Sequence, residues 1–172
     1  MYFYFLLYLF RMVNLANINN EHIDGILEEF EVNILQFLDE DSFISPTIFI
    51  EALHRHGYNI NRFQALFDPI SIDVDAKFLI DDLLHLADFL QQNQEVILEQ
   101  MFANQDVNSS NIIDKVVAEL LVRENQDIEN SVFGILMMSF GVKEDTTSFN
   151  YRNFITYITD PQNSQHLRVQ VV

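Results

Sequence analysis

Residues 102–117 read FANQDVNSSNIIDKVV, and this stretch decides how the rest of the chain is interpreted. Asp106, Asn108 and Ser110 place small, oxygen-bearing side chains at every second position. An apolar residue, Ile113, follows where a short strand is expected, and helical apolar spacing precedes and follows the loop. The stretch therefore predicts a helix, a polar loop with a single apolar anchor, and a second helix.

The same arrangement recurs along the chain. Each unit has one apolar residue that follows a polar loop and precedes a helical pattern, and these anchors are Ile44, Phe78, Ile113 and Phe149. They are separated by 34, 35 and 36 residues, which is the regularity expected of a structural repeat. Four helix–loop–helix units therefore fill residues 19 to 160, and the fold class is predicted to be all-α.

Composition narrows the classes of function. The 172 residues are 49% apolar, with sixteen Phe, four Gly and no Cys, which suits a helical protein with an aromatic core. The absence of Cys excludes disulfides, thiolate metal sites and cysteine nucleophiles. We also find no glycine-rich phosphate loop and no GxSxG motif, so we expect no enzymatic activity. The net charge of −17 disfavours nucleic acid and favours a basic partner.

The chain begins with an apolar run from Tyr2 to Phe10. Nine residues are too few for a membrane helix, which needs about 20, and no basic residue precedes them as in a signal peptide. Two interpretations stay open: a hydrophobic tail that docks on a partner, or an extension upstream of a natural start at Met12. Residues 79–102 are predicted to form either one helix or two helices hinged at Gln91–Gln94. The tail from 161 to 172 is expected to be loose.

The repeat resembles the four-EF-hand architecture of the calmodulin, centrin and light-chain superfamily. The resemblance implies two lobes of paired hands, with a short β bridge between the loops of each pair. The implied bridges join Ile44 to Phe78 and Ile113 to Phe149. The implied division of the chain is an N-terminal extension (1–18), an N-terminal pair (19–90), a C-terminal pair (91–160) and a tail (161–172).

An EF-hand binds calcium through loop positions 1, 3, 5, 7, 9 and 12, with a bidentate glutamate at position 12. The candidate ligands are Ser71, Asp73, Asp75 and Asp82 in the second loop, and Asp106, Asn108, Ser110 and Asp114 in the third. Position 12 is Val117 in the third loop, and the first and fourth loops also lack a carboxylate there. We therefore expect at most one calcium ion, in the second loop. The other loops are expected to be held by hydrogen bonds from their own side chains.

The resemblance also implies a partner. Methionine and phenylalanine side chains of the fourth unit's first helix could line a groove for an amphipathic helix, or could be core; they are Phe133, Met137, Met138 and Phe140. We expect a light-chain-type binder of a basic helix in a larger protein, in the cytoplasm and in a cytoskeletal, ciliary or axonemal assembly. The alternatives are a calcium sensor that switches through residues 71–82, and a membrane-associated helical module that uses the N-terminal apolar run.

Overall fold

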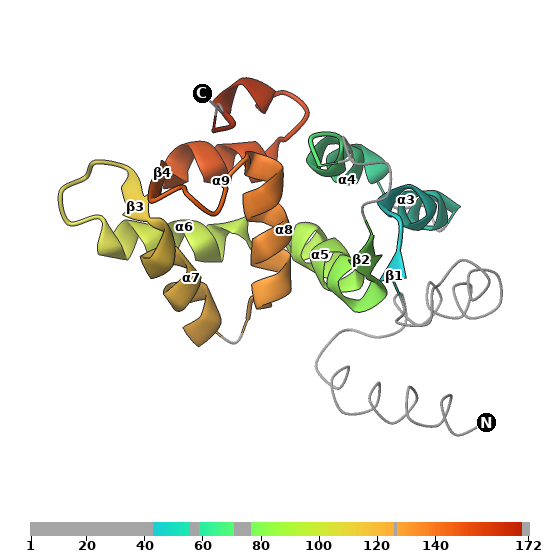
Figure 1. Ribbon diagram of the computed structural model, residues 1–172, viewed down its shortest axis with the longest axis horizontal. Coiled ribbons are helices and arrows are strands. Elements are labelled where there is room, and N and C mark those ends of the chain that lie inside the picture. Colours follow the sequence, from blue (N-terminus) through green and yellow to red (C-terminus); the bar gives the residue numbers. More distant parts are fainter. Residues whose placement is uncertain (1–42, 56–58, 71–76, 126, 170–172) are drawn as a thin grey trace. The chain divides into compact units, whose positions relative to one another are not determined.

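The computed structural model describes residues 43–55, 59–70, 77–125 and 127–169, all within one compact unit of residues 38–172. The described part is mainly helical with two short two-stranded sheets, as the sequence predicts (Figure 1). The start of the first predicted unit, residues 19–42, and the N-terminal apolar run lie outside the described residues. The elements are β1 (Phe43–Ile44), α3 (Pro46–Arg55), α4 (Ile60–Phe67), β2 (Phe78–Leu79), α5 (Ile80–Gln92), α6 (Glu95–Gln105), β3 (Ile112–Asp114), α7 (Lys115–Glu124), α8 (Asn130–Phe140), β4 (Ser148–Asn150), α9 (Tyr151–Thr159) and the 3-10 helix η2 (Gln165–Leu167).

The two sheets confirm the predicted bridges between loops. β1 pairs antiparallel with β2, and Ile44 lies opposite Phe78. β3 pairs antiparallel with β4, and Ile113 lies opposite Phe149. The apolar anchors found from the repeat spacing therefore lie opposite one another in each sheet, as the resemblance implies.

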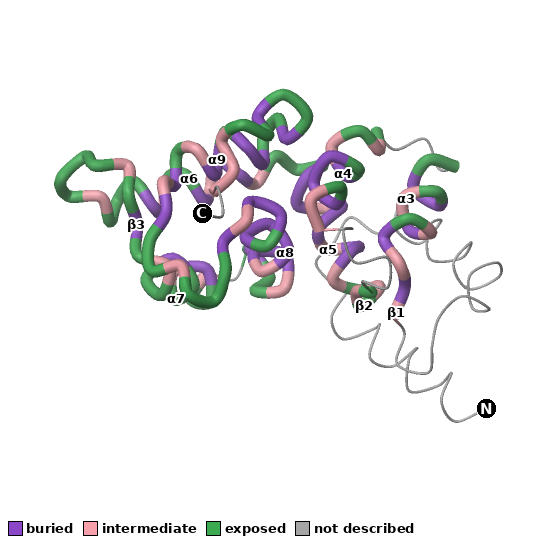
Figure 2. Tube along the Cα trace, turned by 45° about the horizontal axis from the view of Figure 1, so that its top comes forward, coloured by how far each residue is buried: buried purple, intermediate pink, exposed green. Residues whose placement is uncertain are grey.

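An aromatic cluster lies beside each sheet. In the first, Phe67 packs on Phe63 and Phe78, with ring centroids 5.9 and 5.4 Å apart. In the second, Phe102 packs on Phe149 of β4 at 6.4 Å, and Phe149 packs on Phe154 of α9 at 5.6 Å. Figure 2 shows buried positions along the helices, while most of the loop before β3 is exposed. Each cluster buries the apolar stripes of the helices on either side of its sheet.

Residues 79–102 form two helices, so the second of the two predicted alternatives is correct. α5 ends at Gln92, and its C-cap residue Asn93 has a φ of 53° and a ψ of 46°, which place it in the left-handed region. Its amide donates to the Phe89 carbonyl oxygen, and α6 begins two residues later at Glu95. Asn tolerates the left-handed region better than most residues, which explains why the break falls inside the predicted polar stretch.

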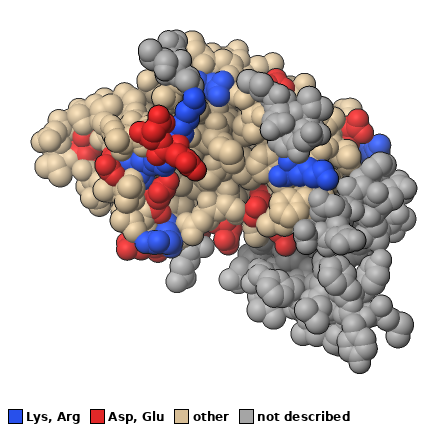
Figure 3. Space-filling model, viewed as in Figure 1, with Lys and Arg blue, Asp and Glu red and all other residues tan. Residues whose placement is uncertain are grey.

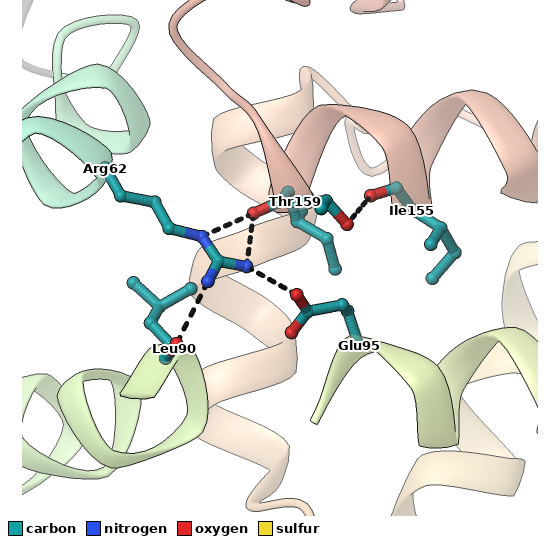
Figure 4. Close-up of polar contacts among 6 residues, drawn as sticks. Arg62, Leu90, Glu95, Ile155 and Thr159 are labelled. Atoms are coloured by element: carbon teal, nitrogen blue, oxygen red, sulfur yellow. Dashed lines mark hydrogen bonds and ion pairs between the residues drawn. The ribbon is translucent and has the colours of Figure 1, made fainter. Parts of the chain in front are cut away.

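Arg62 of α4 joins elements from both predicted pairs of units (Figure 4). Its guanidinium donates to the carbonyl oxygens of Ile158 in α9, at 2.8 and 2.9 Å, and of Leu90 in α5, at 2.9 Å. It also pairs with the carboxylate of Glu95 in α6 at 3.1 Å. Both carbonyls lie in the last turn of their helices, where backbone oxygens lack an intrahelical partner and a cation is favoured. In addition, α8 packs against α4 and α5.

The C-terminal segment differs from the loose tail that the sequence predicts. Between 161 and 169 it is tied to the ends of two helices. The amide of Val169 donates to the Phe140 carbonyl oxygen at 3.0 Å, and Arg168 Nε donates to the Ser139 carbonyl oxygen at 2.7 Å. Gln165 Nε2 reaches the carbonyl oxygen of Ala65 in α4. These bonds satisfy carbonyls at the C-terminus of α8, a long-range role that a segment without periodicity does not reveal.

Candidate partner-binding groove

A groove of about 470 Å³ lies between α7 and α8. α7 contributes an apolar ridge of Val116 and Leu120, four residues apart and therefore neighbours on one helix face. α8 lies opposite and contributes Phe133, Met137 and Met138. Three of the four side chains predicted to line a groove are thus brought together.

The walls of the groove keep large apolar side chains in contact with solvent. Val116 is 61% exposed, Met138 49% and Leu120 39%. Isolated exposed apolar side chains are ordinary, but a contiguous set across two helices marks an interaction surface. Phe133 and Met137 form the buried base of the groove.

Gly134 leaves the space between the walls open. It lies in the middle of α8 and lines the groove, and a Cβ built at this position would meet nothing within 4 Å. Glycine is unfavourable in a helix interior by about 1 kcal/mol relative to alanine. The helix therefore carries a residue that weakens it at a position where a larger side chain would project into the groove.

Phe140 is not in the groove, which corrects the prediction. It is 1% exposed, and its ring packs on Phe154 at 5.3 Å and on Tyr157 at 5.5 Å. Phe140 is two residues beyond Met138, so the 100° turn per residue of an α-helix points the two side chains in different directions. Met138 therefore faces solvent while Phe140 faces the core.

The charges beside the groove are mixed, although the chain is strongly acidic overall. The lining residues include three cations and two carboxylates, which are Lys115, Arg123, Lys143, Glu119 and Glu144. Figure 3 shows acidic and basic side chains intermixed on the face viewed. Lys115 Nζ donates to the Lys143 carbonyl oxygen at 2.8 Å, so α7 is fastened to the loop after α8 at this end of the groove.

Asp106, the first candidate ligand of the third loop, already accepts four hydrogen bonds within the protein. Asp106 Oδ1 accepts from the Ser110 amide at 2.8 Å and from the Ser110 hydroxyl at 3.0 Å. Asp106 Oδ2 accepts from the Asn111 amide at 2.7 Å and from the Tyr151 hydroxyl at 3.3 Å. Partial desolvation acts to raise the pKa of Asp106, but these hydrogen bonds outweigh it and hold the pKa below its ordinary value. Asn111 has a φ of 61°, the left-handed turn expected at the sixth position of such a loop.

The remaining donors of the third loop do not complete a calcium site. Asp114 Oδ1 caps α7 by accepting from the amides of Val116 and Val117. Val117, in the twelfth position, has no side-chain oxygen, and Asn108 is exposed. Calcium takes six to eight oxygen ligands and relies on the twelfth residue for two of them. The residues present therefore do not fit a calcium ion bound in the manner of this loop type.

Most of the second loop lies outside the described residues. Ser71, Asp73 and Asp75 belong to that part of the chain, and Asp82 lies in the first turn of α5. Within the described residues no group of three or more His, Cys, Asp or Glu side chains could hold a metal ion. No described helix is both long and apolar enough to cross a membrane.

Several groove residues were missed by sequence reasoning, namely Val116, Leu120, Gly134 and the flanking cations. A signal for Val116 and Leu120 was present in the sequence of α7, which is KVVAELLVRE. A ten-residue helix on a core buries one stripe, and here only Ala118 and Val122 are buried. The surplus of apolar residues indicates a second apolar face.

The comparisons with known proteins add no relative to this picture. No family model matches the chain, and no curated protein and no solved structure shows significant similarity to it.

Proposed function

We propose that this chain is an EF-hand-like protein that binds an amphipathic helix of a larger protein in the groove between α7 and α8, without a requirement for calcium. The observation that carries the proposal is the groove itself. Its volume is about 470 Å³, and Val116 and Met138 on its two walls are 61% and 49% exposed. Amphipathic helices bind in such grooves through apolar anchors at positions i, i+3, i+4 and i+7.

The chemistry of the walls supports a helical occupant. Met137 and Met138 are flexible and polarizable, which lets them adapt to the side chains of an incoming helix. The floor at Gly134 lets a large anchor side chain enter between the walls. The EF-hand assignment is supported by the regular spacing of the four apolar anchors and by the pairing of Ile44 with Phe78 and of Ile113 with Phe149.

Two features support independence from calcium. Val117 stands where the bidentate ligand is needed, and the Asp106 carboxylate already holds its loop through four hydrogen bonds. Calcium binding is then confined to at most one ion at the second loop. By this proposal the protein is a constitutive, light-chain-type subunit in the cytoplasm, with a cytoskeletal, ciliary or axonemal assembly as its setting.

The test uses two fluorescently labelled helical peptides that share leucines at i, i+3, i+4, i+7 and i+11 and that end in either acidic or basic residues. Anisotropy titrations are run with the full chain in EGTA and in calcium. We expect at least one peptide to bind with the same affinity in both solutions. Binding that appears only with calcium, or no binding of either peptide, contradicts the proposal.

Variants locate the site. Gly134→Leu fills the groove and improves helix propensity, so it should abolish binding while leaving the fold at least as stable. Val116→Ser should weaken binding, because Val116 lines the groove. The matched control is Val96→Ser, since Val96 is a 53% exposed helical valine outside the groove. Equal losses in Val116→Ser and Val96→Ser would rule out the groove as the site.

A further inference from the structure

Charged side chains lie along the edge of the groove in a regular order. Lys115, Glu119 and Arg123 are four residues apart on α7, so they form one charged edge beside the Val116–Leu120 ridge. Lys143 and Glu144, in the loop after α8, lie at the Lys115 end, because Lys115 Nζ contacts both of their carbonyl oxygens at 2.8 and 3.4 Å. Cations thus stand at both ends of the groove, with Glu119 between them and the Glu144 carboxylate next to Lys143 at one end.

Two of these cations are available to a partner. Within the described part of the chain, neither Arg123 nor Lys143 has a carboxylate within 4.0 Å, and both side chains are exposed. The ammonium of Lys115 is already hydrogen-bonded to the backbone. Arg123 carries a planar guanidinium suited to bidentate binding of a carboxylate.

We propose that the helix bound in this groove carries carboxylates at both ends of its apolar face, which would meet Arg123 at one end and Lys143 at the other. This inference rests on the proposed function and names the partner's chemistry. Lys115 and Arg123 are eight residues apart, which corresponds to about 12 Å along a helix. Because Lys143 lies at the Lys115 end of α7, we expect the partner's acidic residues to be about two helical turns apart, with a neutral or basic residue opposite Glu119.

This pattern differs from the basic helix that the net charge of −17 favours. The net charge of the chain and the charges that line the groove act over different distances. At physiological salt the screening length is about 8 Å, so charges far from the groove act weakly on a bound helix. The side chains that line the groove act at contact distance. The overall acidity slows the encounter with an acidic helix, whereas the local cations determine which helix stays bound.

The experiment compares the acidic-ended and basic-ended peptides on the intact chain and on a double variant, Arg123→Glu with Lys143→Glu. We expect the acidic-ended peptide to bind the unmodified chain about tenfold more tightly, the combined effect of gaining two exposed ion pairs and avoiding two like-charge contacts. The double variant should reverse this order. Arg152→Glu is the control, because Arg152 is an exposed arginine on α9 outside the groove.

The outcomes separate the inference from the proposed function. Tighter binding of the basic-ended peptide, or equal binding of both, overturns the inference and leaves helix binding in place. An unchanged order in the double variant also overturns it, as does an equal effect of Arg152→Glu. If neither peptide binds, the proposed function fails and the inference fails with it. Circular dichroism of each variant checks that the helical fold is retained.

Discussion

Arg62 Nη2 lies 3.1 Å from Glu95 Oε1, and the two side chains are only 19% and 8% exposed. Within the described part of the chain, the second carboxylate oxygen, Glu95 Oε2, is buried without a hydrogen-bond partner. Only one of the two Glu95 carboxylate oxygens is therefore paired, whereas the Arg62 guanidinium also donates to two carbonyl oxygens at helix ends. Its main contribution is to satisfy groups that would otherwise be buried alone.

We expect Arg62→Met to destabilise the fold by about 3 kcal/mol, because it leaves the Glu95 carboxylate buried and unpaired. Urea denaturation followed by circular dichroism measures the loss. Arg152→Met is the control, since Arg152 is exposed, and it should change stability by less than about 0.5 kcal/mol. The double variant Arg62→Met with Glu95→Leu should recover part of the loss. A double variant less stable than Arg62→Met alone would contradict this account.

Two glycines of the same helix region should respond in opposite directions to alanine. Gly141 has a φ of +93°, and a Cβ there would lie 2.9 Å from the Val169 carbonyl oxygen. Gly141→Ala should therefore lower the melting temperature, since the left-handed region alone costs alanine about 1–2 kcal/mol. Gly134→Ala meets open space in a regular helix and should raise stability by up to about 1 kcal/mol. Changes of the same sign in both variants would refute the assignment.

Asn93 tests the break between α5 and α6. Its left-handed backbone makes Asn93→Gly neutral or slightly stabilising, whereas Asn93→Val should cost about 1–2 kcal/mol. Thermal denaturation of the two variants measures the difference. If valine were tolerated as well as glycine, the residues around Asn93 would have to continue as a helix.

The Asp106 hydrogen bonds predict a pH dependence in acid. Because the folded pKa of Asp106 lies below its ordinary value of 3.8, the ionised carboxylate is the form that stabilises the loop. This contribution is fully present above pH 3.8 and is lost as the pH falls through the lower folded pKa. The amide proton shifts of Ser110 and Asn111 should titrate with a midpoint below 3.8, and Asp106→Asn should abolish that titration. A midpoint above 3.8 would be inconsistent with these bonds.

Local signals in the sequence predict much of the described fold. The spacing of Ile44, Phe78, Ile113 and Phe149 depends on one apolar residue per loop, and that residue also fixes each strand register. The start of α3 also depends on neighbouring residues alone. The Ser45 hydroxyl accepts from the Ile48 amide at 3.4 Å, next to the proline that begins α3.

Contacts between residues that are far apart in the sequence could not be predicted from the sequence. Arg62 and Ile158 are 96 residues apart, and no periodicity relates an arginine in one helix to a carbonyl oxygen in another. The tail was misjudged for the same reason, because its bonds are to the ends of α8 and α4. The orientation of side chains on α8 is a further example. The methionines of α8 suggested a groove, but which of Met138 and Phe140 faces outward depends on where the core lies.

The junction at Arg62 has a consequence for how the described part of the chain unfolds. One guanidinium binds α5, α6 and α9 while belonging to α4, so none of these helices can detach without breaking its bonds. Elements from both predicted pairs should therefore melt in a single cooperative transition rather than in two steps. Probes placed in α4 and in α9 would then report the same midpoint, and Arg62→Met would pull the two midpoints apart.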